Sequence, residues 1–106
     1  DLRQLGISKL DQEYRPVAED EASDAGREVA ALAEFVVETR TAGPHQTVVK
    51  TVTGAAGQVA LALDHCGWPE IVGTVSGDDT IFIATRTGGD QRRLVAKLRA
   101  RLEKQA

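Results

Sequence analysis

The chain has 106 residues, which is enough for one domain or for one domain and part of another. Its formal charge of −3 at pH 7 argues against strong nucleic-acid binding by the chain itself, because such binding usually needs a basic surplus. The single cysteine, Cys66, excludes an internal disulfide and suits a reducing compartment. No apolar run reaches about 18 residues, and no signal peptide is visible. The sequence starts at Asp1 without a methionine, so we interpret it as a fragment or a processed form.

The first 17 residues offer one helix end and one small hairpin, which is too little to bury a core alone. Residues 1–6 are typical of the last turns of a helix closed by Gly6, and residues 7–17 are compatible with a small hairpin. An acidic, alanine-containing run then leads into a helix, whose N-terminal end favours acidic side chains. We therefore expect an acidic linker and helix over residues 18–33. The apolar stripe of this helix is predicted to be Val29, Leu32, Ala33 and Val36.

A regular pattern begins at residue 35. Two β-branched runs, 35–39 and 47–52, are separated by Ala42-Gly43-Pro44, and they predict a hairpin. Residues 55–66 are predicted to form a helix that ends at Gly67. One side of this helix is apolar and consists of Val59, Ala62, Leu63 and Cys66.

The segment Gly-Thr-Val-Ser-Gly-Asp-Asp-Thr, residues 73–80, lies between two apolar runs, 71–72 and 81–84. We interpret both runs as strands and the segment as the turn between them. Asp78 and Asp79 are then adjacent carboxylates at the mouth of a hairpin. Such a pair repels itself, and a bound cation, either a metal ion or a guanidinium group, would explain it.

The last element is predicted to be a helix capped by Asp90, with Leu94, Val95, Leu98 and Leu102 as its buried stripe. The order from residue 35 onward is β-β-α-β-β-α. We therefore predict an α+β fold, a two-layer sandwich of a four-stranded sheet and two helices, preceded by a linker helix.

The strand at 81–84 is apolar on both sides. Ile81 and Ile83 point to one face of the sheet, and Phe82 and Ala84 point to the other. A face open to water should be polar. We infer that this face meets another subunit; the alternative is that the N-terminal helix covers it.

The segment from Phe35 to Leu102 resembles the C-terminal domain of the bacterial arginine repressors. The resemblance is carried by the whole motif at 73–80, by Thr53-Gly54-Ala55-Ala56 at the helix start, and by Leu63-Asp64 through Trp68-Pro69-Glu70-Ile71. Residues 1–6 resemble the end of the recognition helix in the family's winged helix-turn-helix domain, with its wing in 7–17. The implied organisation is a DNA-binding remnant over 1–17, a linker over 18–33, and an arginine-binding and oligomerisation domain over 34–106.

The resemblance implies a cytoplasmic transcriptional repressor of arginine biosynthesis, neither an enzyme nor a membrane protein, with L-arginine as co-repressor and no other cofactor. Family members form two stacked trimers, bind L-arginine between them, and bind operator DNA as hexamers. Carried over to this sequence, Asp78 and Asp79 would meet the guanidinium or amino group of the ligand. Thr74 and Ser76 would offer main-chain groups, and Asp64 would be a further contact. The family's Gln or His is replaced by Gly57, with Gln58 beside it.

Other interpretations remain open. Asp78 and Asp79 suit an ordinary turn, and Asp64 suits a solvated helix end. A structural oligomerisation module without a ligand is one alternative, and Gly57 favours it. Another is a small enzyme that binds Mg²⁺ through paired carboxylates, although the sequence offers no nucleophile–base pair or phosphate loop. His45, His65 and Cys66 lack zinc-ligand spacing, and Cys66 is expected in the core. The basic residues of the last helix are interpreted as a solvated face, with a DNA or interface contact as the alternative; they are Arg92, Arg93, Lys97, Arg99, Arg101 and Lys104.

Overall fold

The structure, a computed structural model, describes residues 24–102. The predicted winged-helix remnant over 1–17, the start of the linker, and the chain end with Lys104 lie outside the described residues. The elements in chain order are α3 (Asp24–Ala31), the 3-10 helix η2 (Ala33–Phe35), β1 (Val36–Thr41), β2 (Gln46–Thr51), α4 (Ala56–Cys66), β3 (Gly73–Ser76), β4 (Thr80–Ala84) and α5 (Gly88–Arg101). This order confirms the predicted β-β-α-β-β-α arrangement and the preceding helix.

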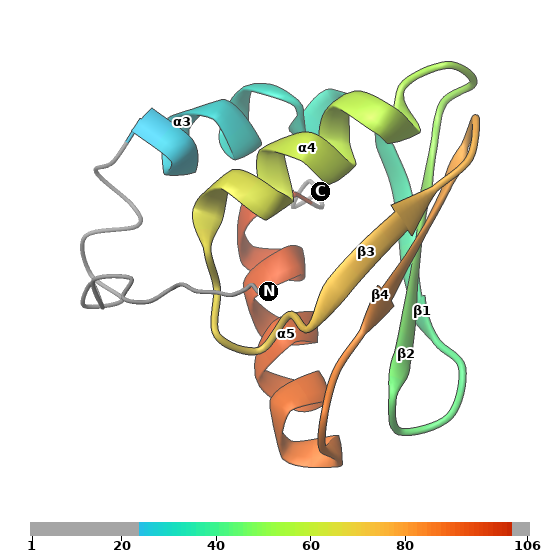
Figure 1. The fold of residues 1–106 in the computed structure, drawn as a ribbon. Helices are drawn as coiled ribbons and strands as arrows, with labels where there is room; N and C mark the ends of the chain where they lie inside the picture. The colour runs from blue at the N-terminus through green and yellow to red at the C-terminus, as the bar shows by residue number, and fades with distance from the viewer. Residues whose placement is uncertain (1–23, 103–106) are drawn as a thin grey trace.

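The four strands form one sheet in the order β1-β2-β4-β3, and each neighbouring pair is antiparallel. Both predicted hairpins are present, β1 with β2 and β3 with β4. The central pair, β2 and β4, joins the two hairpins, with Val49 opposite Ile81 and Thr47 opposite Ile83. Helices α4 and α5 lie on the same side of the sheet, and α3 lies beside α4 (Figure 1). The result is the predicted two-layer α+β sandwich.

The core lies between the sheet and the helices. Ile81 and Ile83 of β4 and Val49 of β2 are completely buried, as the alternation of strand side chains predicts. They meet apolar residues of the helices, including Leu63 of α4 and Leu94 of α5. Each such side chain contributes about 1.5–3 kcal/mol to folding through burial of apolar surface. Cys66 belongs to this cluster, which confirms its expected place in the core.

The predicted helical stripe Val29, Leu32, Ala33 and Val36 extends beyond the end of the observed helix. Helix α3 stops at Ala31, η2 follows, and Val36 is the first residue of β1 rather than part of a helical stripe. Val29 lies in the core, and Leu32, Ala33 and Val36 pack against it, so the apolar side of the segment is as predicted. The chain has to change direction to enter the sheet, and the hydrogen bond from Phe35 N to Leu32 O at 3.0 Å closes the short turn that does so.

The start of α5 also differs from the prediction. Thr87, not Asp90, is the N-cap residue, and its hydroxyl oxygen accepts a hydrogen bond from Asp90 N at 3.0 Å. Asp90 occupies the third helical position. A Thr-x-x-acid pattern satisfies free N–H groups at a helix start and places the acid near the positive end of the dipole. The predicted stripe is otherwise correct: Leu94, Leu98 and Leu102 are fully buried, and Val95 is half-buried.

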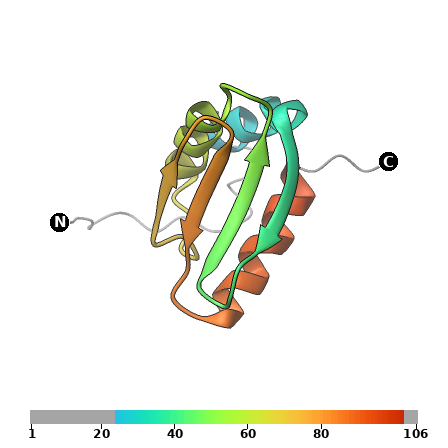
Figure 2. The same ribbon diagram turned by 90° about the vertical axis from the view of Figure 1, so that its right-hand side faces the viewer.

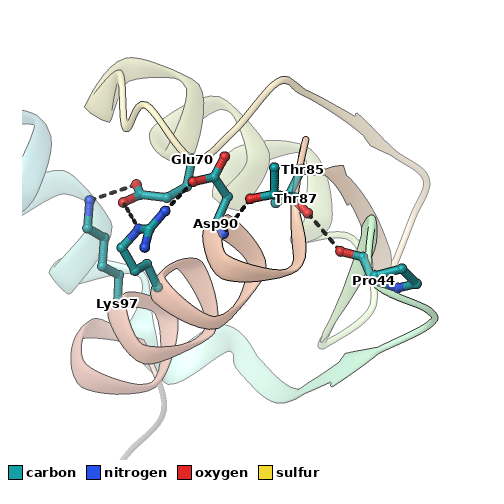
Figure 3. A network of polar contacts seen from close by, with 7 residues as sticks. Pro44, Glu70, Thr85, Thr87, Asp90 and Lys97 are labelled. Carbon is teal, nitrogen blue, oxygen red and sulfur yellow. Dashed lines mark hydrogen bonds and ion pairs between the residues drawn. The ribbon is translucent and has the colours of Figure 1, made fainter.

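The segment between α4 and β3 is held against α5 by a buried acid. Gly67 ends α4 in the left-handed conformation at φ 65°, which glycine adopts at low cost. The carboxylate of Glu70 then accepts a hydrogen bond from Lys97 Nζ at 2.8 Å, and Arg93 lies 3.8 Å away (Figure 3). Lys97 also lies over the ring of the buried Trp68. These contacts position the chain that leads into β3.

The second face of the sheet carries no helix within residues 24–102 (Figure 2). Helix α3 packs on α4, so it does not cover this face, and the alternative that it might is wrong. One row across the face contains Val48, Phe82 and Val75. Phe82 is 47% exposed and Val75 is 71% exposed. An apolar row of this kind on an uncovered face is typical of an interaction surface.

Candidate ligand site

The paired acids lie in a turn shorter than the sequence suggested. Residues 73–76 form the strand β3, so only residues 77–79 connect it to β4; the interpretation of the whole motif as a turn, with Ile71 and Val72 as the strand, is wrong. Thr74 and Val75 are β-branched and suit an extended chain. The turn is closed by a hydrogen bond from Gly77 N to Thr80 O at 2.8 Å.

The main chain of this turn is anchored to the segment that opens α4. The carbonyl oxygen of Asp78 accepts hydrogen bonds from Gly54 N at 3.1 Å and Ala56 N at 3.2 Å. The carbonyl oxygen of Asp79 accepts one from Thr51 N at 2.9 Å. Both acids are therefore fixed beside the N-terminal end of α4, where the helix dipole favours negative charge.

The two carboxylates differ in their partners. Asp79 Oδ1 accepts a hydrogen bond from the hydroxyl of Thr80 at 2.9 Å and lies 3.9 Å from Lys50 Nζ. Lys50 Nζ also donates to Thr80 Oγ1 at 2.6 Å. The side chain of Asp78 is exposed and makes no hydrogen bond or ion pair with any residue in the range 24–102. Asp78 is thus the one of the two paired carboxylates that has no side-chain partner in this range.

Asp64 and Thr74 form a second part of the site. The hydroxyl of Thr74 donates to Asp64 Oδ1 at 2.9 Å. Asp64 lies near the C-terminal end of α4, and Thr74 lies near the start of β3. Because the chain reverses between the two elements, β3 runs back along α4 toward the helix start. The strip between them leads from Asp64 to the turn that carries Asp78.

Gly57 and Gln58 are both exposed on the first turn of α4. A Cβ atom built on Gly57 would meet nothing within 4 Å. Gln58 borders a shallow hollow of about 270 Å³, together with Leu61 and residues of α3. Ser76 is exposed at the end of β3, opposite Ile81.

Five of the seven sequence-predicted residues, Asp64, Thr74, Ser76, Asp78 and Asp79, lie along this strip, whereas Gln58 borders the hollow beside α3. Asp64 and Thr74 are in direct contact, and Asp78 and Asp79 share the turn. Gly57 has no side chain, and no contact between the side chain of Gln58 and the two acids is found among the described residues. The candidate residues are open to solvent, because only Thr74 and Asp79 of the seven are half-buried and the others are exposed.

Lys50 was missed by the sequence analysis. It lies in β2, and its register places it opposite Thr80 of β4. Local sequence gave one signal, a charged residue in an otherwise uncharged strand, but nothing in the sequence fixed which strand β2 would pair with. The pairing of β2 with β4 is what brings Lys50 to Asp79.

Residues 24–102 contain neither a metal-binding cluster nor a membrane-spanning helix. No group of three or more His, Cys, Asp or Glu side chains that could hold a metal ion is found there. His65 instead contacts Glu28 at 3.1 Å, which links α4 to α3, and His45 contacts Thr85 O at 3.3 Å. None of the helices described is long and apolar enough to cross a membrane.

Comparison with known proteins shows which family this chain belongs to. Residues 32–100 match the family described as arginine repressor, C-terminal domain. An arginine repressor of Koribacter versatilis (strain Ellin345) is 40% identical over 102 residues, which cover 93% of this chain and 68% of that protein. An arginine repressor of Desulforudis audaxviator (strain MP104C) is 39% identical over 106 residues, covering 92% and 71% respectively. The chain therefore belongs to the arginine repressor family, which confirms the resemblance noted in its motifs.

Proposed function

We propose that this chain is the ligand-sensing and oligomerising part of an arginine-dependent transcriptional repressor of arginine biosynthesis, with L-arginine as its co-repressor. The observation that carries the proposal is Asp78, an exposed carboxylate without a side-chain partner among the described residues, held in a fixed turn at the start of α4. A guanidinium group is planar and pairs with a carboxylate through two parallel hydrogen bonds. The relatives' name, arginine repressor, supports the same ligand.

The remaining candidate residues fit an amino-acid ligand. Asp64 and Thr74 lie at the other end of the strip and offer a carboxylate and a hydroxyl. Ser76 lies between them and the turn, on the edge strand β3. We propose that Asp79 completes the acidic end of the site, and that Gly57 leaves a position where a hydrogen-bonding side chain would otherwise meet the ligand.

The site is proposed to be completed by another subunit. Its residues are mostly exposed on a single chain, whereas small-molecule sites usually bury most of the ligand surface. The apolar row of Val48, Phe82 and Val75 gives a second reason for self-association. We propose trimers that stack into a hexamer, with L-arginine between the trimers. Ligand binding and assembly would then strengthen each other by linkage.

The rest of the repressor function is proposed for the full-length protein. We propose that residues 1–17 end a winged-helix DNA-binding domain, that 18–33 link it to the sensing domain over 34–106, and that the protein acts in the cytoplasm. Operator DNA would be bound through the winged-helix domain. This is a regulatory and not an enzymatic role, in keeping with the names of the relatives.

Calorimetry tests the proposal. The chain is titrated with L-arginine, citrulline, lysine and Mg²⁺. Binding of arginine in preference to citrulline and lysine would support it, and binding of Mg²⁺ alone would favour the enzyme alternative. No binding at all would favour an oligomerisation module without a ligand, the alternative that the missing side chain at Gly57 supports.

The variant Asp78→Ala tests whether Asp78 contacts the ligand. The variant should stay folded and lose arginine affinity by about tenfold to more than a hundredfold, the size expected for a lost charged hydrogen bond. Asp24→Ala is the matched control, because it removes the same charge at the start of α3, near the opposite end of α4. Equal arginine affinity in Asp78→Ala and the unaltered chain would refute the assignment.

A further inference from the structure

Lys50 is the cation closest to the paired acids within the described residues, and it is built into the sheet. It lies in β2 with Glu38 of β1 on one side and Thr80 of β4 on the other. Glu38 forms its own ion pair with Arg40 at 3.0 Å. The contacts of Lys50 are instead made toward β4, to Thr80 and Asp79.

The contacts form a directed chain of polar groups. The ammonium group of Lys50 donates to Thr80 Oγ1 at 2.6 Å, and the Thr80 hydroxyl donates onward to Asp79 Oδ1 at 2.9 Å. A hydroxyl that accepts from a cation is polarised and becomes a better donor. The orientation of Asp79 is therefore set by Lys50 both directly, through charge, and through Thr80.

This arrangement gives the two acids different electrostatic environments. Lys50 offsets part of the negative potential at Asp79, whereas no described side chain does so at Asp78. The side chains of Lys50 and Asp79 are 39% and 50% exposed, so their attraction is moderated by solvent. The same positive charge repels a cationic group placed near Asp79 and attracts an anionic one.

We propose that Lys50 is a specificity-determining residue of the arginine site, which selects a ligand that carries a carboxylate besides its cationic groups. This inference rests on the proposed function. Arginine has a guanidinium, an ammonium and a carboxylate group. Agmatine, its decarboxylated form, keeps both cations and lacks the anion. Lys50 repels the cationic groups of both ligands but attracts the carboxylate that only arginine carries, so agmatine meets the repulsion without the attraction and is disfavoured relative to arginine.

The experiment compares the dissociation constants of arginine and agmatine by calorimetry. In the unaltered chain agmatine should bind more weakly. In Lys50→Gln the ratio of the agmatine to the arginine constant should fall about threefold, the effect of one partly exposed charge pair. Lys50→Arg keeps the charge and should keep the ratio. Arg86→Gln removes an exposed cation beyond the opposite end of β4 and should also leave the ratio unchanged.

The outcomes separate this inference from the proposed function. Arginine binding to the unaltered chain with the same ratio in Lys50→Gln overturns the role of Lys50 alone. No arginine binding to the unaltered chain overturns both. An equal fall of the ratio in Arg86→Gln would show a general charge effect and would also overturn it. Circular dichroism and urea unfolding check that each variant folds, and Lys50→Met provides a second neutral variant should Lys50→Gln fail to fold.

Discussion

Gly57→Gln tests the proposal that position 57 is a ligand-contact position at which this chain lacks a hydrogen-bonding side chain. Gly57 is the second residue of α4, it is exposed, and an added Cβ would meet nothing within 4 Å. Its backbone is not among the glycines with positive φ, which are Gly43, Gly54 and Gly67. A side chain at this position therefore requires no positive φ and meets no clash at its Cβ atom.

The magnitude has two separate parts. Replacing glycine in a helix should raise the free energy of unfolding by about 0.5 kcal/mol without any ligand, because the unfolded chain loses freedom. If the new amide reaches the ligand, one neutral hydrogen bond adds about 0.5–1.5 kcal/mol to binding. Arginine affinity should then rise about twofold to twelvefold.

Urea unfolding measures the first part and calorimetry with arginine the second. Gly57→Ala is the matched control, because it gives the helical gain without the amide group. Arginine affinities that are equal in Gly57→Gln and Gly57→Ala would refute the hydrogen bond. Gln58→Ala should change affinity little, since a shift of one residue turns a helical side chain by about 100°. A marked loss in that variant would show that Gln58 is the working contact.

Three further predictions follow from the sheet, the charge and the loop. The chain should form trimers or hexamers, and arginine should shift this equilibrium toward hexamers. In light scattering, Phe82→Glu should reduce the association, because it places a charge in the exposed apolar row. A monomer at micromolar concentration in all conditions would contradict this prediction. With its net charge of −3, the chain should give no sequence-specific gel shift with operator DNA at low nanomolar concentration, even with arginine. Glu70→Gln should lower the free energy of unfolding by about 2–4 kcal/mol, since it leaves the largely buried Lys97 unpaired, whereas Glu38→Gln at an exposed pair should cost below about 1 kcal/mol. Similar urea midpoints for the two variants would show that burial of the Glu70 pair does not matter.

The fold could be predicted from local patterns where side-chain periodicity and the residues that end helices and strands indicated the same element. The alternation in β4 placed Ile81 and Ile83 in the core, and Gly67 marked the end of α4. The errors fall where several residues could serve the same role. Thr87 and Asp90 can both cap a helix, and only the tertiary position of the chain decided for Thr87. Glycine at the start of β3 suggested a turn, but pairing with β4 at Ala84 extended the strand.

The candidate site shows the same division. Asp78 and Asp79 stood out in the sequence because the whole motif is contiguous. The contact between Asp64 and Thr74 crosses ten residues and a change of element, and the contact between Lys50 and Asp79 depends on a strand pairing across a helix. Periodicity carries no information on such pairing. The polar partners of a motif are thus harder to predict than the motif, although they decide how its two acids differ.

The position of the turn gives a physical reason for coupling between ligand and assembly. Through its main chain, Asp78 is joined to the start of α4, in the helical layer. Through Thr80 and Lys50, Asp79 is joined to the open face of the sheet, where Phe82 lies next but one along β4. A ligand that orders this turn therefore acts on both sides of the sandwich at once. If a neighbouring subunit packs on the open face, its contacts and those of the ligand stabilise the same turn. By reciprocity, ligand binding then strengthens subunit association, and association strengthens ligand binding.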